Sequence, residues 1–217
     1  MILIPVKGLA QAKQRLASVL GQPARTELAQ AMLRDVFEAL DGWADRPAVS
    51  VITSDPFALE LAEHFCFEII VDKANRGETE AIQEATRVCQ SRGIDNTLVI
   101  PGDIPLVEAW ELEKVLKAAP LEGTVLAPAA DRRGTNAAFR RPCGLFPLRF
   151  GNDSFQPHLA AARATGKPCV VLSLAGIALD IDGPWDLRQL AVASGETHSQ
   201  RLARRWNLAD LSLPVNQ

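Results

Sequence analysis

Several features that mark large protein classes are missing from this sequence of 217 residues. No apolar run approaches the ~20 residues that a helix needs to span a bilayer. The N-terminus has neither the basic leader nor the cleavage site of a signal peptide. The four cysteines are not paired at metal-ligand spacing, so we expect reduced structural thiols. Together these absences favour a reducing, cytoplasmic location and no association with a membrane.

A strong excess of one charge is also lacking. The net charge is -3, which does not suggest a nucleic-acid binder, although Arg201, Arg204 and Arg205 form a short basic stretch. Hydrophobic residues make up 47% of the chain, enough for one core. We therefore expect a single domain over residues 1–217, with the last ten or so residues forming a loose tail.

The nucleotide-binding loops that are easiest to recognise are absent as well. There is no Gly-x-x-x-x-Gly-Lys-Ser/Thr loop and no Gly-x-Gly-x-x-Gly loop after the first expected strand. This counts against P-loop and dinucleotide-binding folds. The histidines are scattered, and no Ser/His/Asp set can be argued from their spacing.

Short apolar runs do alternate along the chain with segments of helical periodicity. The expected strands cover residues 2–6, 49–53, 67–71, 97–100, 124–127, 137–139 and 169–172. The expected helices cover residues 23–40, 56 onward, 78–91, 107–119, 155–165, 184–193 and 199–206. This alternation predicts an α/β fold in three layers, with a mostly parallel sheet covered by helices on both faces. Ligands of such sheets bind at the carboxyl ends of the strands.

Aspartates occur at two possible strand ends, after the strand 97–100 and at residues 180–182. Asp103 comes directly after the buried strand 97–100, beside Gly102, which lets a ligand approach the backbone closely. Asp180 and Asp182 alternate on an expected strand end and should point to one side. Carboxylates of this kind suit Mg²⁺, so the three form a plausible metal triad for phosphoryl chemistry. The alternative is that Asp103 and Asp182 cap helices and Asp180 is a surface charge.

Two further groups could bind anions. Residues 150–155 (FGNDSF) end at an expected helix start with Asp153 or Ser154 as N-cap, where backbone N–H groups and the hydroxyls of Ser154 and Thr135 could hold a phosphate or carboxylate. Lys7, Lys13 and Arg15 follow the first strand and could reach nucleotide phosphates. The alternatives are a plain capped loop and solvated lysines.

His158 lies one turn into the expected helix 155–165. It either borders this anion site or, as we favour, occupies a surface position of the helix.

The order of these motifs resembles the 2-phospho-L-lactate guanylyltransferase family, whose bacterial members include phosphoenolpyruvate and 3-phosphoglycerate guanylyltransferases of coenzyme F-420 biosynthesis. The resemblance runs from residue 1 to about residue 190. It rests on residues 4–7 (IPVK), 12–16 (AKQRL), 101–106 (PGDIPL), 134–137 (GTNA), 150–155 (FGNDSF) and 179–184 (LDIDGP).

The resemblance implies a nucleotide-diphospho-sugar transferase (GT-A-like) fold and a reaction that couples GTP to a small phosphorylated acid and releases diphosphate. It implies that Asp103, Asp180 and Asp182 hold Mg²⁺ and carry catalysis. The acid substrate would lie on three other residues, Thr135, Gly151 and Ser154. The nucleotide would lie on Lys7, Lys13, Gly77, Thr79 and Gly102.

The chain departs from the family pattern at one loop. Where the family typically reads Gly-Leu-Asn-x-Ala, this chain reads GETEA at residues 77–81. Thr79 replaces an amide, and Glu78 and Glu80 add negative charge. This motivates an alternative in which the nucleotide or acceptor differs. A second alternative is a nucleotide-binding relative without catalysis. Leu202, Trp206, Leu208 and Leu211 could pack on the chain's own core or on a second copy in a homodimer.

Overall fold

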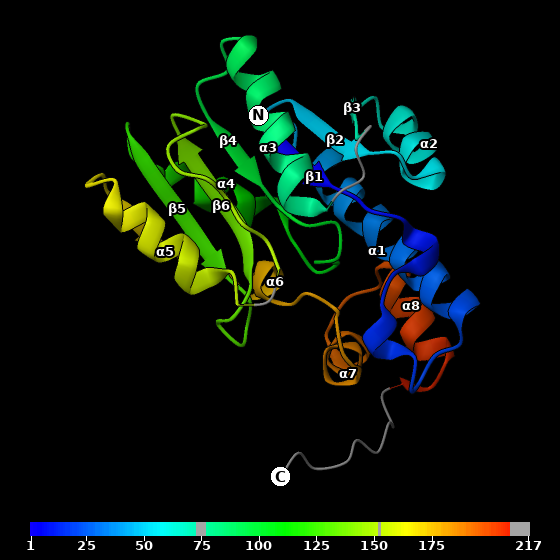
Figure 1. The fold of residues 1–217 in the computed structure, drawn as a ribbon. Coiled ribbons are helices and arrows are strands. Elements are labelled where there is room, and N and C mark those ends of the chain that lie inside the picture. The colour runs from blue at the N-terminus through cyan, green and yellow to red at the C-terminus, as the bar shows by residue number, and fades with distance from the viewer. Residues whose placement is uncertain (73–76, 152, 209–217) are drawn as a thin grey trace.

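The computed structural model describes residues 1–72, 77–151 and 153–208, which are organised around one seven-stranded sheet (Figure 1). The strands are β1 (Ile2–Pro5), β2 (Val49–Thr53), β3 (Glu68–Val71), β4 (Thr97–Val99), β5 (Gly123–Pro128), β6 (Thr135–Arg141) and β7 (Cys169–Val171). Their order across the sheet is β3-β2-β1-β4-β6-β5-β7. The expected tail, with Leu211, lies outside the described residues.

The sheet is mixed but mostly parallel, as predicted. β1 pairs in parallel with β2 and β4, β2 with β3, and β5 with β7, whereas β6 runs antiparallel to both β4 and β5. Because β6 runs the other way, its first residues lie at the edge where its neighbours end. Thr135 and Asn136 therefore line one cavity together with Pro101 and Asp103 of the loop that follows β4.

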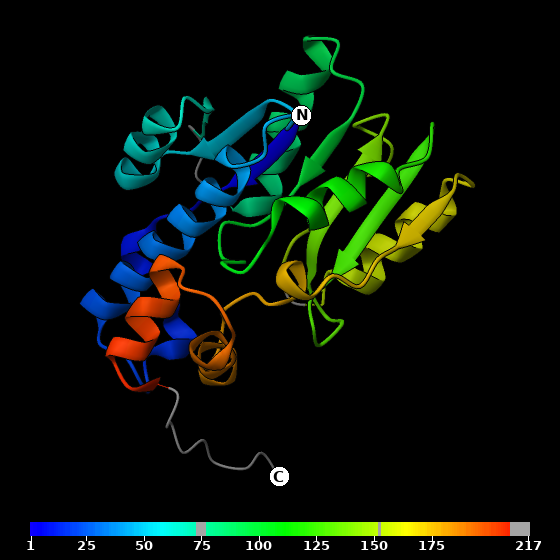
Figure 2. The same ribbon diagram turned by 180° about the vertical axis from the view of Figure 1, so that it is seen from behind.

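Helices cover both faces of the sheet. They are α1 (Gln22–Asp41), α2 (Pro56–His64), α3 (Glu78–Ser91), α4 (Ala109–Lys117), α5 (Phe155–Ala164), α6 (Ala175–Ala178), α7 (Pro184–Val192) and α8 (His198–Arg205). Two short 3₁₀ turns, Leu9–Gln11 and Gln14–Leu16, follow β1. Figure 1 shows α3 and α5 on one face, and Figure 2 shows α1 and α4 on the other.

The strand residues alternate between two cores, one on each side of the sheet. Ile2 and Ile4 pack among residues of α1, α2 and α4, whereas Leu3 packs among residues of α3 and α5. A period of two is what a strand covered on both faces requires. The result is the expected three-layer α/β/α arrangement.

Local signals set the helix starts. Asp55 caps α2 by accepting hydrogen bonds from the backbone N–H groups of Phe57 and Ala58, at 3.0 and 3.1 Å, with Pro56 as the first helical residue. The expected bounds of β2 and α3 agree with the structure, and most others differ by one or two residues.

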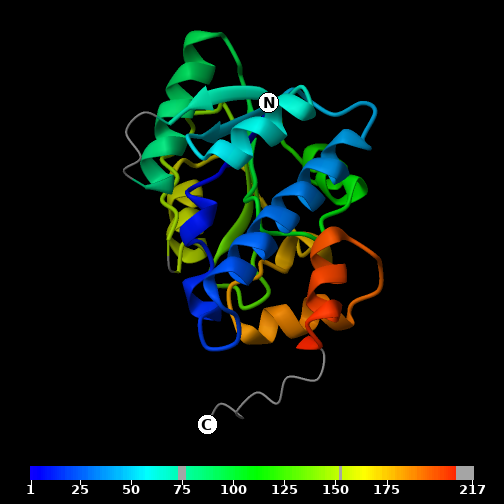
Figure 3. The same ribbon diagram turned by 90° about the vertical axis from the view of Figure 1, so that its right-hand side faces the viewer.

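At one end of the molecule α8 packs on α1, and α7 packs on α8 (Figure 3). Leu208 is buried in the chain's own core, and Trp206 packs against that core. Within the described residues, no helix combines the length and apolar character needed to cross a membrane.

Candidate active site

A buried lysine joins two of the three predicted metal-binding aspartates. Lys13 lies between the 3₁₀ turns after β1, Asp103 in the loop after β4, and Asp182 just before α7. The Lys13 ammonium donates hydrogen bonds to Asp103 and, at 3.0 Å, to Asp182. Its side chain is only 7% exposed, and the two carboxylates raise the lysine pKa against the opposing effect of burial. These aspartates therefore already share one positive charge.

The backbone at Lys13 is held in an unusual conformation. Its φ of 58° and ψ of 41° lie in the left-handed region, which costs of order 1 kcal/mol or more for a residue other than glycine. The surrounding structure holds Lys13 in this conformation and so also fixes the direction of its Cα–Cβ bond.

Asp180 also lies at this edge of the sheet, but it does not lie on a strand. The prediction that Asp180 and Asp182 alternate on a strand end is wrong, because the helical turn α6 precedes an irregular segment at 179–182. The Asn136 side chain donates to Asp180 Oδ1 at 2.9 Å. Burial, helped by the charges of Asp103 and Asp182, raises the pKa of Asp180 to about 6 although the Asn136 hydrogen bond lowers it.

The three aspartates are not drawn together as tightly as ligands around an ion. Among the described residues, the one set of three ligand side chains within 4.8 Å of one another is Asp35, Glu38 and His198. Asp103 and Asp182 are instead spaced by the Lys13 ammonium that both of them contact.

Two cavities meet at these aspartates. The first, about 380 Å³, is lined by Lys7, Lys13 and Arg15 together with apolar residues of α1. The second, about 430 Å³, is lined by Thr135 and Ser154 among other polar residues. Asp103, Asp182, Arg15, Glu78 and Pro101 line both. A basic compartment and a hydroxyl-lined compartment thus share an acidic boundary, which Asp180 joins from the second cavity.

The expected anion-binding group is assembled in the second cavity. Ser154 is the N-cap residue of α5, but its hydroxyl makes no capping bond and accepts from the Thr135 backbone N–H at 3.1 Å. Thr135 and Ser154 are both 4% exposed. Gly151 lines this cavity with a φ of 135°, a conformation open to glycine and rarely adopted by other residues.

His158 is not on the surface, contrary to our sequence interpretation. It is 1% exposed, and its two ring nitrogens contact the Thr135 hydroxyl and the Arg149 backbone N–H. The signal was present in the sequence, because His158 follows Phe155 by three residues and precedes Ala162 by four. That spacing places it on the buried face of α5.

The divergent segment at 77–81 forms the start of α3, and Glu78 in it lines both cavities. The Thr79 hydroxyl accepts from the Phe150 backbone N–H at 2.9 Å and donates to the Phe150 carbonyl at 3.3 Å. Thr79 therefore ties the start of α3 to the loop that carries Gly151. Glu78 faces both cavities, and burial, reinforced by the negative charge of Asp103, raises its pKa to about 7.

The remaining predicted nucleotide-binding residues lie around the first cavity or beside it. Lys7 forms an ion pair with Asp72. Gly102 lines the cavity, and a Cβ there would meet Leu33 Cδ1 at 2.8 Å. Close packing on α1 is thus one reason for a glycine at 102. Gly77 is the N-cap residue of α3.

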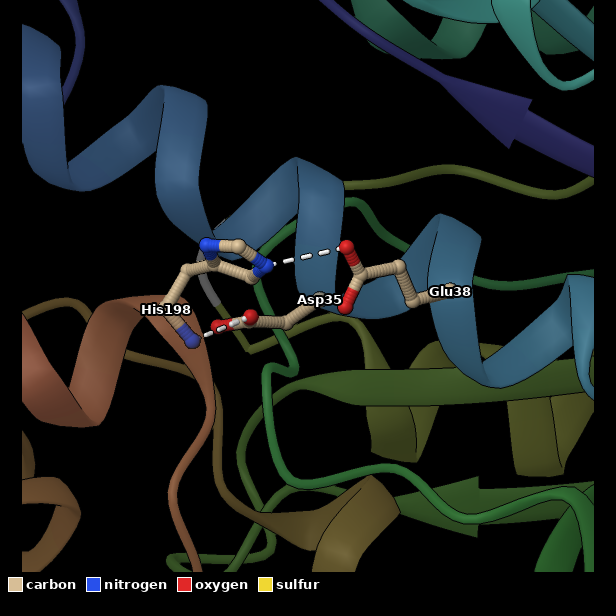
Figure 4. Close-up of side chains that lie close together, drawn as sticks. All are labelled: Asp35, Glu38 and His198. Carbon is tan, nitrogen blue, oxygen red and sulfur yellow. Dashed lines mark hydrogen bonds and ion pairs between the residues drawn. The ribbon is translucent and has the colours of Figure 1, made fainter.

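The cluster of Asp35, Glu38 and His198 has a structural explanation (Figure 4). Asp35 accepts hydrogen bonds from the backbone N–H groups of His198 and Ser199, at 2.7 and 2.9 Å, and from the Ser199 hydroxyl. The His198 ring contacts Glu38 at 2.9 Å. These bonds fasten the start of α8 to α1 and occupy both oxygens of Asp35.

Comparison with known proteins identifies the family of this chain. The family model described as "Guanylyl transferase CofC like" matches residues 1–210. This chain belongs to that guanylyltransferase family. A basic compartment and a hydroxyl-lined compartment that meet at carboxylates agree with the nucleotidyl-transfer class.

Named relatives cover most of the chain. A phosphoenolpyruvate guanylyltransferase of Sphaerobacter thermophilus is 35% identical over 87% of this chain and 91% of its own length. A 2-phospho-L-lactate guanylyltransferase of Methanothermobacter thermautotrophicus is 32% identical over 94% and 89%. A 3-phospho-D-glycerate guanylyltransferase of Colwellia psychrerythraea is 30% identical over 89% and 91%.

Solved structures agree with the fold. A candidate nucleotide-diphospho-sugar transferase from Desulfovibrio desulfuricans matches with a TM-score of 0.78 and 20% identity, covering 95% of this chain and 94% of its own. A CMP:2-keto-3-deoxy-manno-octonic acid synthetase in complex with CTP matches with a TM-score of 0.58 and 15% identity, over 88% and 95%. The predicted nucleotide-diphospho-sugar transferase fold is thereby confirmed.

Proposed function

We propose that this guanylyltransferase transfers GMP from GTP to the phosphate of a small phosphorylated carboxylic acid and releases diphosphate, as a step in the biosynthesis of coenzyme F-420. The observation that carries the proposal is the junction of the two cavities at Asp103 and Asp182. The basic cavity suits the triphosphate, and the hydroxyl-lined cavity at the start of α5 suits the acid. The named relatives act on three acids of this class.

The reaction joins two polyanions. A phosphate oxygen of the acid attacks the α-phosphorus of GTP, a new P–O bond forms, and the bond to diphosphate breaks. No protein nucleophile is needed, so catalysis rests on positioning and on neutralising charge. In this chain Lys13 and Arg15 supply positive charge at the boundary, while Thr135 and Ser154 hold the acid.

The residues at this boundary fit a magnesium ion. Asp103, Asp180 and Asp182 offer hard oxygen ligands, and Mg²⁺ is usually held by one or two carboxylates together with substrate phosphates. The Lys13 ammonium, which lies within ion-pair distance of both Asp103 and Asp182, supports this fit. When bound there, Mg²⁺ would neutralise charge on the phosphates. Lys13, displaced from a carboxylate, would then be available to a phosphate oxygen.

The test is diphosphate release from GTP and Mg²⁺ with 2-phospho-L-lactate, phosphoenolpyruvate and 3-phosphoglycerate in turn. We expect release with at least one acid, and its loss in Asp182→Asn. The proposal is wrong if the protein binds GTP and releases no diphosphate with any of them.

A different nucleotide is the second candidate, and Glu78 is the observation that favours it. Its carboxyl group lies where the family typically has leucine, and it faces the basic cavity. Assays with GTP, CTP, UTP and ATP separate the candidates. Markedly better turnover with CTP or UTP would replace the guanylyl assignment.

A further inference from the structure

The backbone of Arg149 fixes which nitrogen of the His158 ring carries the proton. The Arg149 N–H lies 2.8 Å from His158 Nε2. A backbone N–H can only donate, so Nε2 must accept and cannot carry a proton. The loop that holds this N–H is itself anchored, because the next residue, Phe150, bonds to Thr79 through both its N–H and its carbonyl.

The proton of the neutral imidazole must therefore sit on Nδ1. Burial, together with the nearby charge of Arg140, lowers the pKa of His158 to about 4, although the Arg149 hydrogen bond opposes this. The ring is thus neutral at physiological pH and carries one proton. Nδ1 lies 2.9 Å from the Thr135 oxygen, so Nδ1–H donates and Thr135 accepts.

Two hydroxyls of the second cavity then both act as hydrogen-bond acceptors toward the protein. Thr135 Oγ1 accepts from His158, and Ser154 Oγ accepts from the Thr135 backbone N–H. Within the described residues, neither hydroxyl proton has a protein acceptor. Both side chains line the second cavity, where an anionic ligand would need donors.

We propose that His158 is a positioning residue, which orients Thr135 as a donor to a carboxylate or phosphate oxygen of the acceptor acid. The inference rests on the proposed function for the identity of the ligand. With the opposite tautomer, the Thr135 proton would point to the ring, and its lone pairs would face the anion. The position of one proton on a buried ring thus decides whether the cavity attracts or repels the acid at Thr135.

The kinetic test compares His158→Leu, which removes the donor, with His158→Asn, whose amide can present an N–H near the position of Nδ1. We expect His158→Leu to raise the KM for the acid about tenfold or more and to leave the KM for GTP within about twofold. His158→Asn should recover most of the loss. Leu159→Ala, on the same helix, is the control for disturbance of α5 and should leave both KM values near wild type.

A double-mutant cycle shows whether His158 acts through Thr135. Thr135→Val should raise the KM for the acid by itself, and adding His158→Leu should then have little further effect. Equal losses from His158→Leu in both backgrounds would overturn the proposal, as would a parallel rise in the KM for GTP.

The tautomer can be measured without turnover. In protein labelled with ¹⁵N-histidine, NMR should show His158 as the Nδ1–H tautomer across pH 6 to 8. An Nε2–H tautomer or an imidazolium would contradict the proposal. A wild-type protein that releases no diphosphate with any acid would contradict the proposed function instead, while the NMR result still decides the state of His158.

Discussion

At the scale of single residues, Lys13 combines a buried ammonium with a left-handed backbone conformation. It bonds to Asp103 and Asp182 across sequence separations of 90 and 169 residues. In the protein alone the ammonium and a metal ion would compete for the same carboxylates, whereas during catalysis both would neutralise phosphate charge. Removing the ammonium should therefore strengthen Mg²⁺ binding and weaken turnover.

Replacing Lys13 by glutamine should therefore separate metal binding from turnover. We expect Lys13→Gln to bind Mg²⁺ more tightly than wild type in the absence of nucleotide, and to lose about 100-fold or more in kcat. Calorimetric titration with Mg²⁺ and a diphosphate-release assay provide the two measurements. A variant that binds Mg²⁺ more weakly would show that the ammonium does not compete for the carboxylates.

Glu78 supports a second prediction at this scale. Above its raised pKa of about 7, Glu78 carries a negative charge among Asp103, Asp182, Lys7 and Lys13 and should repel a triphosphate. Glu78→Leu, which restores the residue typical of the family, should lower the KM for GTP several-fold, and Glu78→Gln should do so to a similar extent. Glu80→Gln, an exposed neighbour, is the matched control. A higher KM for GTP in both Glu78 variants would instead make this carboxylate a nucleotide-binding group.

At the scale of elements, the packing of α8 on α1 gives a prediction about stability. Asp35 holds two backbone N–H groups and one hydroxyl at the start of α8 (Figure 4). We expect Asp35→Ala to lower the free energy of unfolding by about 2 kcal/mol. Its kcat should remain near wild type, because Asp35 lines neither cavity of the site.

The control is Glu38→Ala, which removes only the partly exposed contact with His198 and should cost less than about 1 kcal/mol. Denaturant unfolding measures both variants. Equal stability losses would mean that the bonds to Asp35 are not what holds α8 in place.

Elements were predictable from the sequence where the signal is local. Asp55 and Pro56 marked the start of α2, and the apolar repeat of residues 28–40 marked α1. The direction of β6 was not predictable, because it depends on which strands flank it. That direction is what places Thr135 and Asn136 beside Asp180.

The site residues, too, were predictable where the signal is local and not where it depends on distant parts of the chain. The sequence located Asp103 because its position after a strand is a local feature, and the structure places it at the sheet edge. The segment that carries Asp180 was misread because α6, with four residues, is too short to produce a periodic pattern. The contact of Lys13 with Asp103 joins distant parts of the chain and has no local signature.

The whole molecule should show opposing effects of two buried groups on its stability against pH. The pKa of His158 is lowered from 6.5 to about 4, beside Arg140, so the unfolded chain binds the extra proton and stability rises with pH across that window. The pKa of Asp180 is raised from 3.8 to about 6, beside Asp103 and Asp182, so the folded chain holds the extra proton and stability falls with rising pH across its window.

Substitution should expose each effect in turn. Between pH 4 and 6, His158→Asn should lose stability more steeply than wild type as pH rises. Asp180→Asn should gain stability over the same range, and its melting temperature at pH 7 without metal should exceed that of wild type. Thermal melts across this range test both. Parallel curves for all three proteins would contradict the assigned burial of these groups.

In the proposed reaction, GMP from GTP and a phosphorylated acid are joined where the two cavities meet. Phosphorus-31 NMR of the protein with GTP, Mg²⁺ and each acid follows this reaction directly. We expect diphosphate and a new phosphoanhydride signal pair that joins GMP to the phosphate of one acid, both absent with Asp182→Asn. GTP that remains intact with every acid, or that yields only GDP and inorganic phosphate, would contradict it.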